Sequence, residues 1–182
     1  MSPAPGSRVA ELTSKVCIVG DFAVGKTSIA ERFVNNQFSE KYLTTVGVKI
    51  DTKEIERPES GVIHKLVIWD VAGSDRFDDT QYAYLRGASG YIYVADGTRA
   101  ATLASVRQLQ EQISQRYSDL PAVALVNKSD LASDWEISDE QIVALGARFN
   151  GVFQTSAKTG DAVEGAIDKL AALILDTVLQ DS

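Results

Sequence analysis

Short runs of apolar residues recur along the chain, and segments with helical periodicity lie between them. Four of these runs have the length and composition of buried strands: Val16–Val19, Tyr91–Ala95, Ala122–Val126 and Val152–Phe153. Helices are expected over 27–36, 103–113, 138–149 and 163–178, and apolar residues in the last three repeat every three to four positions. Because alternating strands and helices build parallel sheets, this pattern predicts an α/β fold with helices on both faces of the sheet.

Two further strands are expected close together in the first half of the chain. The β-rich runs 46–55 and 62–69 are separated by the polar turn Arg57–Gly61, which predicts an antiparallel hairpin. The expected fold is therefore a mostly parallel six-stranded sheet with one antiparallel strand. Residues 1–13 are interpreted as a flexible N-terminal arm, and residues 14–180 as a single domain.

The composition excludes several classes of protein. The 182 residues carry a formal net charge of −7 at pH 7, which argues against a nucleic-acid polymer as partner and against a polybasic membrane anchor. The single cysteine, Cys17, excludes an intramolecular disulfide and is expected to be a small core residue. The single histidine, His64, excludes a His–His metal site and is expected on an edge strand of the hairpin. With no signal peptide, membrane-spanning run or C-terminal prenylation cysteine in the sequence, we expect a cytoplasmic protein without a direct membrane anchor.

The segment Gly20–Thr27 matches the pattern G-x-x-x-x-G-K-[ST] between the first strand and the first helix. Glycines let backbone N–H groups turn inward around phosphates, and the helix N-terminus adds a partial positive charge. Lys26 would reach the β- and γ-phosphates, and the Thr27 hydroxyl would bind Mg²⁺. The nucleotide-binding residues expected here are Asp21, Phe22, Ala23, Val24, Gly25, Lys26, Thr27 and Ser28.

A second motif, Asn127–Asp130, follows a buried strand at the edge where open α/β sheets bind ligands. The Asp130 carboxylate can accept hydrogen bonds from N1–H and the exocyclic amine of guanine, whereas adenine offers no such pair of donors. A site of this kind rejects the wrong base by roughly 10⁴-fold. The two motifs together predict a guanine-nucleotide site and disfavour an ATP-using kinase.

With these motifs in this order, the chain resembles a Ras-superfamily small GTPase of the Rab branch, with a P-loop NTPase G domain. The segment Tyr42–Gly47 resembles switch I, and Trp69–Gly73 resembles the opening of switch II. The resemblance implies that Thr45 completes the Mg²⁺ shell and senses the γ-phosphate, although Thr45 could instead simply open a strand. It also implies that Asp70 holds Mg²⁺ through water and that the Gly73 N–H contacts the γ-phosphate.

The same resemblance assigns the base-binding residues, including the segment Thr155–Lys158. The Asn127 side chain would brace the base loop against the phosphate loop, the Lys128 stem would lie along the base, and the Ala157 N–H would bond guanine O6. Phe38 would lie against the guanine edge, although it could instead be an ordinary core residue. The remaining nucleotide contacts implied are Tyr42, Leu131, Ser156 and Lys158.

The implied function is a molecular switch that binds GTP or GDP with Mg²⁺ and hydrolyses GTP to GDP and phosphate. Effectors and regulators would bind a monomer through residues 38–48 and 73–87. The residues expected to act in hydrolysis are Lys26, Thr45, Gly73 and Ser74. The missing prenylation cysteine leaves two interpretations, a shortened chain or a relative that works without a prenyl anchor, such as a prokaryotic one; we favour the second.

Two residues depart from the family pattern at the hydrolytic site. Ser74 stands where relatives usually carry the glutamine that orients the attacking water, and Phe22 stands where they carry glycine or serine. Ser74 could also simply continue a loop, and Phe22 could pack on switch II rather than obstruct an incoming arginine finger. Gln81 could replace the missing glutamine only if switch II folded back. We expect slow GTP hydrolysis that an arginine-finger activator does not accelerate; the alternative is a GTP-binding scaffold with negligible hydrolysis.

The switch II region also combines acidic and aromatic residues. The acidic residues Asp75, Asp78 and Asp79 are most simply a solvated face, with a partner-binding surface as the alternative. Three aromatic residues are expected to be exposed there and to suit a nucleotide-dependent interface: Phe77, Tyr82 and Tyr84.

Overall fold

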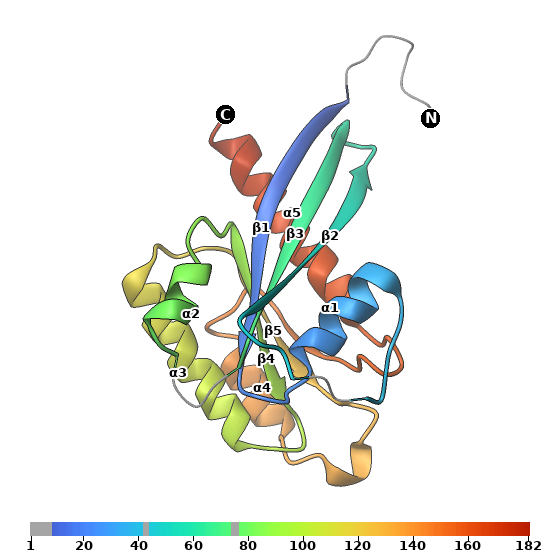
Figure 1. Ribbon diagram of the computed structural model, residues 1–182, viewed down its shortest axis with the longest axis vertical. Helices are drawn as coiled ribbons and strands as arrows, with labels where there is room; N and C mark the ends of the chain where they lie inside the picture. Colours follow the sequence, from blue (N-terminus) through green and yellow to red (C-terminus); the bar gives the residue numbers. More distant parts are fainter. Residues whose placement is uncertain (1–8, 42–43, 74–76) are drawn as a thin grey trace.

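The computed structural model describes residues 9–41, 44–73 and 77–182, and within them six strands form one sheet in the order β2-β3-β1-β4-β5-β6 (Figure 1). The strands are β1 (Ala10–Gly20), β2 (Val48–Arg57), β3 (Val62–Val71), β4 (Gly90–Asp96), β5 (Ala122–Asn127) and β6 (Val152–Gln154). Neighbouring strands are parallel except for the β2–β3 hairpin, which is antiparallel. The predicted fold class is therefore confirmed.

Helices cover both faces of this sheet (Figure 1). They are α1 (Lys26–Asn35), α2 (Asp79–Tyr84), α3 (Ala101–Arg116), α4 (Asp139–Leu145) and α5 (Val163–Gln180). Alternate residues of β1 point to opposite faces: Val16 and Ile18 join the core beneath α1 and α5, whereas Cys17 and Val19 join the core beneath α2, α3 and α4. The central strands are buried on both sides, which explains their uninterrupted apolar runs.

The first strand is longer than the sequence pattern indicates. Residues 10–13, assigned above to a flexible arm, continue β1 and pair with residues 62–65 of β3. That assignment was wrong because this half of β1 is mostly exposed and lacks the apolar run that marks a buried strand.

His64 lies on an inner strand, not on an edge strand as expected. Its strand, β3, is flanked by β1 and β2, while β2 and β6 are the edges of the described sheet. The imidazole is fully buried, with Nε2 at 2.9 Å from the Ser14 hydroxyl, and burial lowers the pKa of His64. The expectation failed because strand order depends on the pairing of β1 with β3, which a local hairpin pattern does not encode.

The aromatic residues near α2 are less exposed than predicted. Tyr82 is buried and packs edge-to-face against the half-buried Phe77, with ring centroids 5.0 Å apart. Tyr84 is half-buried. The prediction was wrong because α2 and the residues just before it pack these rings against the face of the sheet that α3 also covers.

Two further expectations concern the core and the membrane. Cys17 is fully buried, as predicted, and burial raises the pKa of its thiol to about 12. In the part of the chain that the structure describes, no helix is both long and apolar enough to cross a bilayer.

Candidate guanine-nucleotide site

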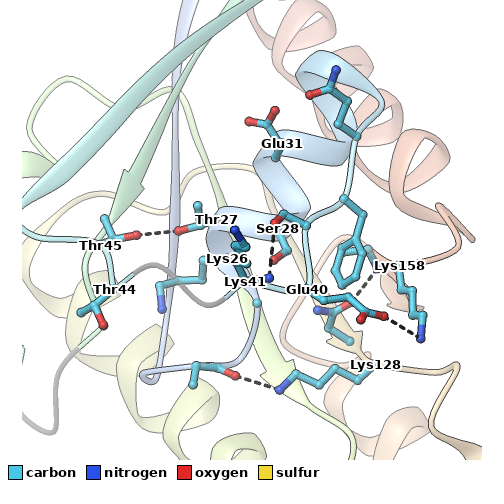
Figure 2. Close-up of a pocket in the computed structure, with 18 of the residues that line it drawn as sticks. Lys26, Thr27, Ser28, Glu31, Glu40, Lys41, Thr44, Thr45, Lys128 and Lys158 are labelled. Atoms are coloured by element: carbon cyan, nitrogen blue, oxygen red, sulfur yellow. Dashed lines mark hydrogen bonds and ion pairs between the residues drawn. The ribbon is translucent and has the colours of Figure 1, made fainter.

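A cavity of about 670 Å³ opens at the carboxyl ends of the central strands, where open α/β sheets bind ligands (Figure 2). Its walls come from the β1–α1 loop and the start of α1, from residues 37–41, 44 and 45, and from the loops that follow β3, β5 and β6. This volume lies within the range of sites that bury a small ligand. The sequence motifs, far apart along the chain, meet here.

Glycines allow the phosphate loop to approach its neighbours closely. Gly25 has a φ of 102°, and a Cβ there would lie 2.4 Å from the Asn127 amide nitrogen. Gly73 lies against the same loop, since a Cβ at this position would be 2.7 Å from both the Phe22 nitrogen and the Lys26 ammonium. A side chain at Gly25 would displace the Asn127 amide, and one at Gly73 would displace the loop or the lysine.

Lys26, the first residue of α1, is held at the floor of the cavity. Its ammonium donates to the Asp21 carbonyl at 2.7 Å, and only 6% of the residue is exposed. Burial lowers the pKa of Lys26 to about 8, because the attraction of Asp70 and Asp21 offsets only part of the desolvation and the positive Arg99 opposes the charge further. A buried ammonium at a helix N-terminus is well placed to gain an anionic partner.

Three oxygen-bearing side chains converge beside Lys26. The Thr27 hydroxyl donates to Asp70 Oδ2 at 2.5 Å and lies 2.6 Å from the Thr45 hydroxyl, an approach visible in Figure 2. Asp70 is fully buried, and its Oδ1 has no hydrogen-bond partner among the described residues. Burial raises the pKa of Asp70, whereas the Thr27 hydrogen bond and the Lys26 charge oppose that rise. Hydroxyl and carboxylate oxygens suit Mg²⁺, and the unpartnered Oδ1 is an acceptor that a hydrated cation could satisfy.

Asn127 connects the base side of the cavity to the phosphate loop. Its amide nitrogen donates to the Val24 carbonyl at 3.1 Å, and its oxygen accepts from the Thr155 hydroxyl at 3.1 Å and the Ala157 N–H at 3.3 Å. Because the side chain is buried, these contacts hold three loops in one arrangement.

The other residues assigned to the base lie along the same wall. The exposed Asp130 accepts from the Ser156 hydroxyl at 2.8 Å, which orients its carboxylate. Phe38 and Leu131 line the cavity, and Phe38 also packs against the core, so both of its expected roles have a structural basis. Lys158 pairs with Glu40 at 3.4 Å across the cavity mouth, as Figure 2 shows.

Some expected site residues do not line the cavity with their side chains. The Val24 side chain is in the core and the Ser156 residue is buried; the Val24 carbonyl accepts from Asn127, and the Ser156 hydroxyl donates to Asp130. Asp21 contributes its carbonyl to Lys26. Two expected residues, Tyr42 and Ser74, lie outside the described residues.

Phe22 and Gln81, the residues raised as modifiers of hydrolysis, have different surroundings. Phe22 lines the cavity and remains 52% exposed. Gln81 is buried, closes a capping box with Asp78 at the start of α2, and donates to the Ala72 carbonyl at 2.7 Å. That bond brings α2 back beside the end of β3, but Gln81 is not among the residues that line the cavity.

Two residues beside the phosphate loop, Asp96 and Arg99, were missed by sequence reasoning. Asp96, at the end of β4, is 1% exposed and accepts from Lys128 at 2.9 Å and from Arg99 at 3.1 Å. Burial raises the pKa of Asp96, but the hydrogen bonds from Lys128, Thr98 and Arg99 outweigh it and leave the pKa lowered. The signal that could have found Asp96 is its place directly after a buried strand, at the same sheet edge as Asn127.

Comparison with known proteins agrees with this geometry. The sequence model of the Ras family matches residues 15–176. The chain is 34% identical to Ras-related protein Rab-32C of Dictyostelium discoideum, over 91% of this chain and 75% of that protein. It is 32% identical to Ras-related protein Rab-7L1 of Rattus norvegicus, over 92% of this chain and 84% of that protein. It is also 32% identical to Ras-related protein SEC4 of Candida albicans, over 97% of this chain and 84% of that protein.

Proposed function

Because this chain belongs to the Ras family of GTP-binding small GTPase switches, we propose that it binds GTP and GDP together with Mg²⁺ and hydrolyses GTP slowly. The observation that carries the proposal is the meeting of the buried Lys26 ammonium with the oxygens of Thr27, Thr45 and Asp70 in one cavity. A cation, a helix N-terminus and a cluster of hard oxygen donors together match a polyphosphate that carries Mg²⁺.

The phosphate end would work by positioning and charge neutralisation. Thr27 and Thr45 would hold Mg²⁺ directly and Asp70 would hold it through water, each giving up a present hydrogen bond. Bound Mg²⁺ would neutralise charge on the β- and γ-phosphates. Lys26 would exchange its bond to a carbonyl for phosphate oxygens, and Gly73 leaves room for its own N–H to approach the γ-phosphate.

The base end would select guanine through Asp130. The Ser156 hydroxyl donates to one carboxylate oxygen of Asp130 at 2.8 Å, and this bond would orient the carboxylate toward the two donors of guanine. The Ala157 N–H, now in a long 3.3 Å contact with Asn127, would turn to guanine O6 at little cost.

Switching would follow from the contacts of Thr45 and Gly73. Loss of the γ-phosphate would remove the ligand that both residues share, and would release residues 38–48 and 73–87. We propose that effectors and regulators of a monomeric protein read these two segments. The region around Thr45 already exposes Val46 and Ile50 to solvent, which fits a docking role.

Slow hydrolysis is proposed from two residues. Serine at position 74 is too short to orient water as glutamine does, and a misplacement of about one ångström costs roughly 10²-fold in rate. The exposed ring of Phe22 lines the cavity and would obstruct an arginine finger entering from a partner. The alternative, a GTP-binding scaffold with negligible hydrolysis, rests on the same two residues.

Two measurements test the proposal. Chromatography of nucleotide released from the purified protein should identify GDP or GTP; an adenine nucleotide would refute the assignment of Asp130. Single-turnover hydrolysis of GTP should then be slow in the wild type and about 10²-fold faster in Ser74→Gln. Ser60→Gln, in the exposed β2–β3 turn, is the matched control and should change nothing. A fast wild type that Ser74→Gln does not accelerate contradicts slow hydrolysis, whereas no turnover in either protein favours the scaffold.

A further inference from the structure

Arg99, in the loop between β4 and α3, lies against the backbone of the phosphate loop. Its Nη2 donates to the Phe22 carbonyl at 2.8 Å, and its Nε donates to Asp96 Oδ2 at 3.1 Å. The guanidinium is thus held at both ends, one on a buried carboxylate and one on a loop carbonyl. Arg99 is not among the residues that line the cavity, so it would act on a ligand through the loop or through its charge, which also reaches Lys26.

The same carboxylate oxygen anchors a second cation on the next carbonyl of the loop. Lys128 Nζ lies 2.9 Å from Asp96 Oδ2 and donates to the Ala23 carbonyl at 2.9 Å. Two successive carbonyls, those of Phe22 and Ala23, are therefore each bound by a cation fixed on Asp96. Hydrogen bonds from charged donors are stronger than those between neutral groups, so this arrangement restrains both peptide units.

The bonds to these two carbonyls also fix the direction of the N–H group that follows each carbonyl. In a planar trans peptide, which this one is, the carbonyl oxygen and the following N–H point opposite ways. When Arg99 holds the Phe22 carbonyl, the Ala23 N–H must point away from Arg99. Both Phe22 and Ala23 line the cavity, whereas Arg99 does not.

The loop needs such a restraint because Ala23 is strained. Its φ is 61°, in the left-handed region that residues with a Cβ seldom adopt. A non-glycine residue keeps this conformation only when surrounding contacts enforce it. The hydrogen bonds from Arg99 to the Phe22 carbonyl and from Lys128 to the Ala23 carbonyl provide such contacts.

We propose that Arg99 is a positioning residue of the phosphate site: anchored on Asp96, it fixes the Phe22–Ala23 peptide so that the Ala23 N–H faces the phosphates beyond the α-phosphate. This inference rests on the proposed binding of guanine nucleotides and adds a residue outside the cavity to it. Without Arg99 the peptide is free to rotate. Nucleotide binding must then also restore the loop conformation, which makes the binding free energy less favourable.

The test compares two guanine nucleotides in wild-type protein and in Arg99→Ala, with dissociation constants measured by calorimetric titration. We expect Arg99→Ala to bind GDP about tenfold more weakly, which corresponds to roughly 1.4 kcal/mol. Binding of GMP, which lacks the β-phosphate, should change less than about twofold on the same scale. Arg99→Lys retains the charge but cannot bind Asp96 and the Phe22 carbonyl through two separate nitrogens. It should therefore bind GDP more tightly than Arg99→Ala but more weakly than the wild type.

Arg116→Ala is the matched control, because the Arg116 side chain has the same 45% exposure as that of Arg99 and also pairs with an aspartate, Asp79. It should leave the affinity for both nucleotides unchanged. The inference is overturned if Arg99→Ala binds GDP as tightly as the wild type, or if it loses affinity for GDP and GMP equally, since the second result indicates a general loss of structure. A wild-type protein that binds no guanine nucleotide overturns the proposed function itself, and is distinguishable because it appears before any variant is made.

Discussion

The contact between Gly25 and Asn127 offers the sharpest test of how the two halves of the site are joined. In Gly25→Ala the new Cβ would lie 2.4 Å from the Asn127 amide nitrogen, at a φ of 102°. The backbone strain at this φ costs about 1–3 kcal/mol. Displacing a buried amide from the Val24 carbonyl costs about 1–3 kcal/mol more. We therefore expect a loss of roughly 2–6 kcal/mol in the free energy of unfolding.

Urea unfolding of nucleotide-free protein measures this loss, and two other glycines separate its parts. Gly61→Ala, at a φ of 64° with nothing within 4 Å of the new Cβ, carries backbone strain alone and should cost about 1–2 kcal/mol. Gly165→Ala, inside α5 with open space around it, should stabilise the protein by about 0.5–1 kcal/mol. If Gly25→Ala is no more destabilising than Gly61→Ala, the Asn127 bridge does not hold the loops together and the reasoning fails.

Three other predictions concern the base, the pH and the buried thiol. Asp130→Asn replaces two acceptor oxygens by one donor and one acceptor. In competition binding, it should lower the affinity for GDP by at least about 10²-fold and raise the affinity for xanthosine diphosphate. The pKa of Lys26 is lowered to about 8 in the folded protein, so the unfolded chain binds more protons than the folded protein above that pH. The free energy of unfolding of the nucleotide-free protein should therefore rise from pH 8 toward pH 10.5, while the affinity for GDP falls because the ammonium loses its proton. Both trends should be absent in Lys26→Gln. Cys17, with a pKa near 12, should resist alkylation in the native protein at pH 8 and react only after denaturation, as followed by mass spectrometry; rapid labelling of native protein would contradict its burial.

Local segments of the site could be predicted because their geometry is carried by neighbouring residues. The phosphate loop needs Gly25 and Lys26 at a set spacing before a helix, and the structure starts α1 at Lys26. The motif that starts at Asn127 likewise begins at the last residue of β5. In both cases the backbone conformation and the chemical group lie within a few residues of each other.

Other features depended on contacts between distant segments. Arg99 and Asp96 look like an ordinary loop in sequence, and they reach the phosphate loop only because β4 pairs with β1, with Val94 opposite Gly20. His64 was expected on an edge because the hairpin alone does not reveal that β1 pairs with its outer side. The burial of Tyr82 was not predicted, because the sequence of a short helix does not show which of its faces packs against the sheet.

The sequence by itself therefore determined the class of fold, the ligand that the motifs indicate and the residues that carry those motifs. These follow from hydrophobic periodicity and from short spacings, both of which are local properties of the chain. Only the tertiary structure decided which strands lie at the edge, which residues close the cavity and which cation outside the cavity holds the phosphate loop. These depend on strand order and packing, since residues such as Arg99 and Phe22 become neighbours only when the sheet has formed.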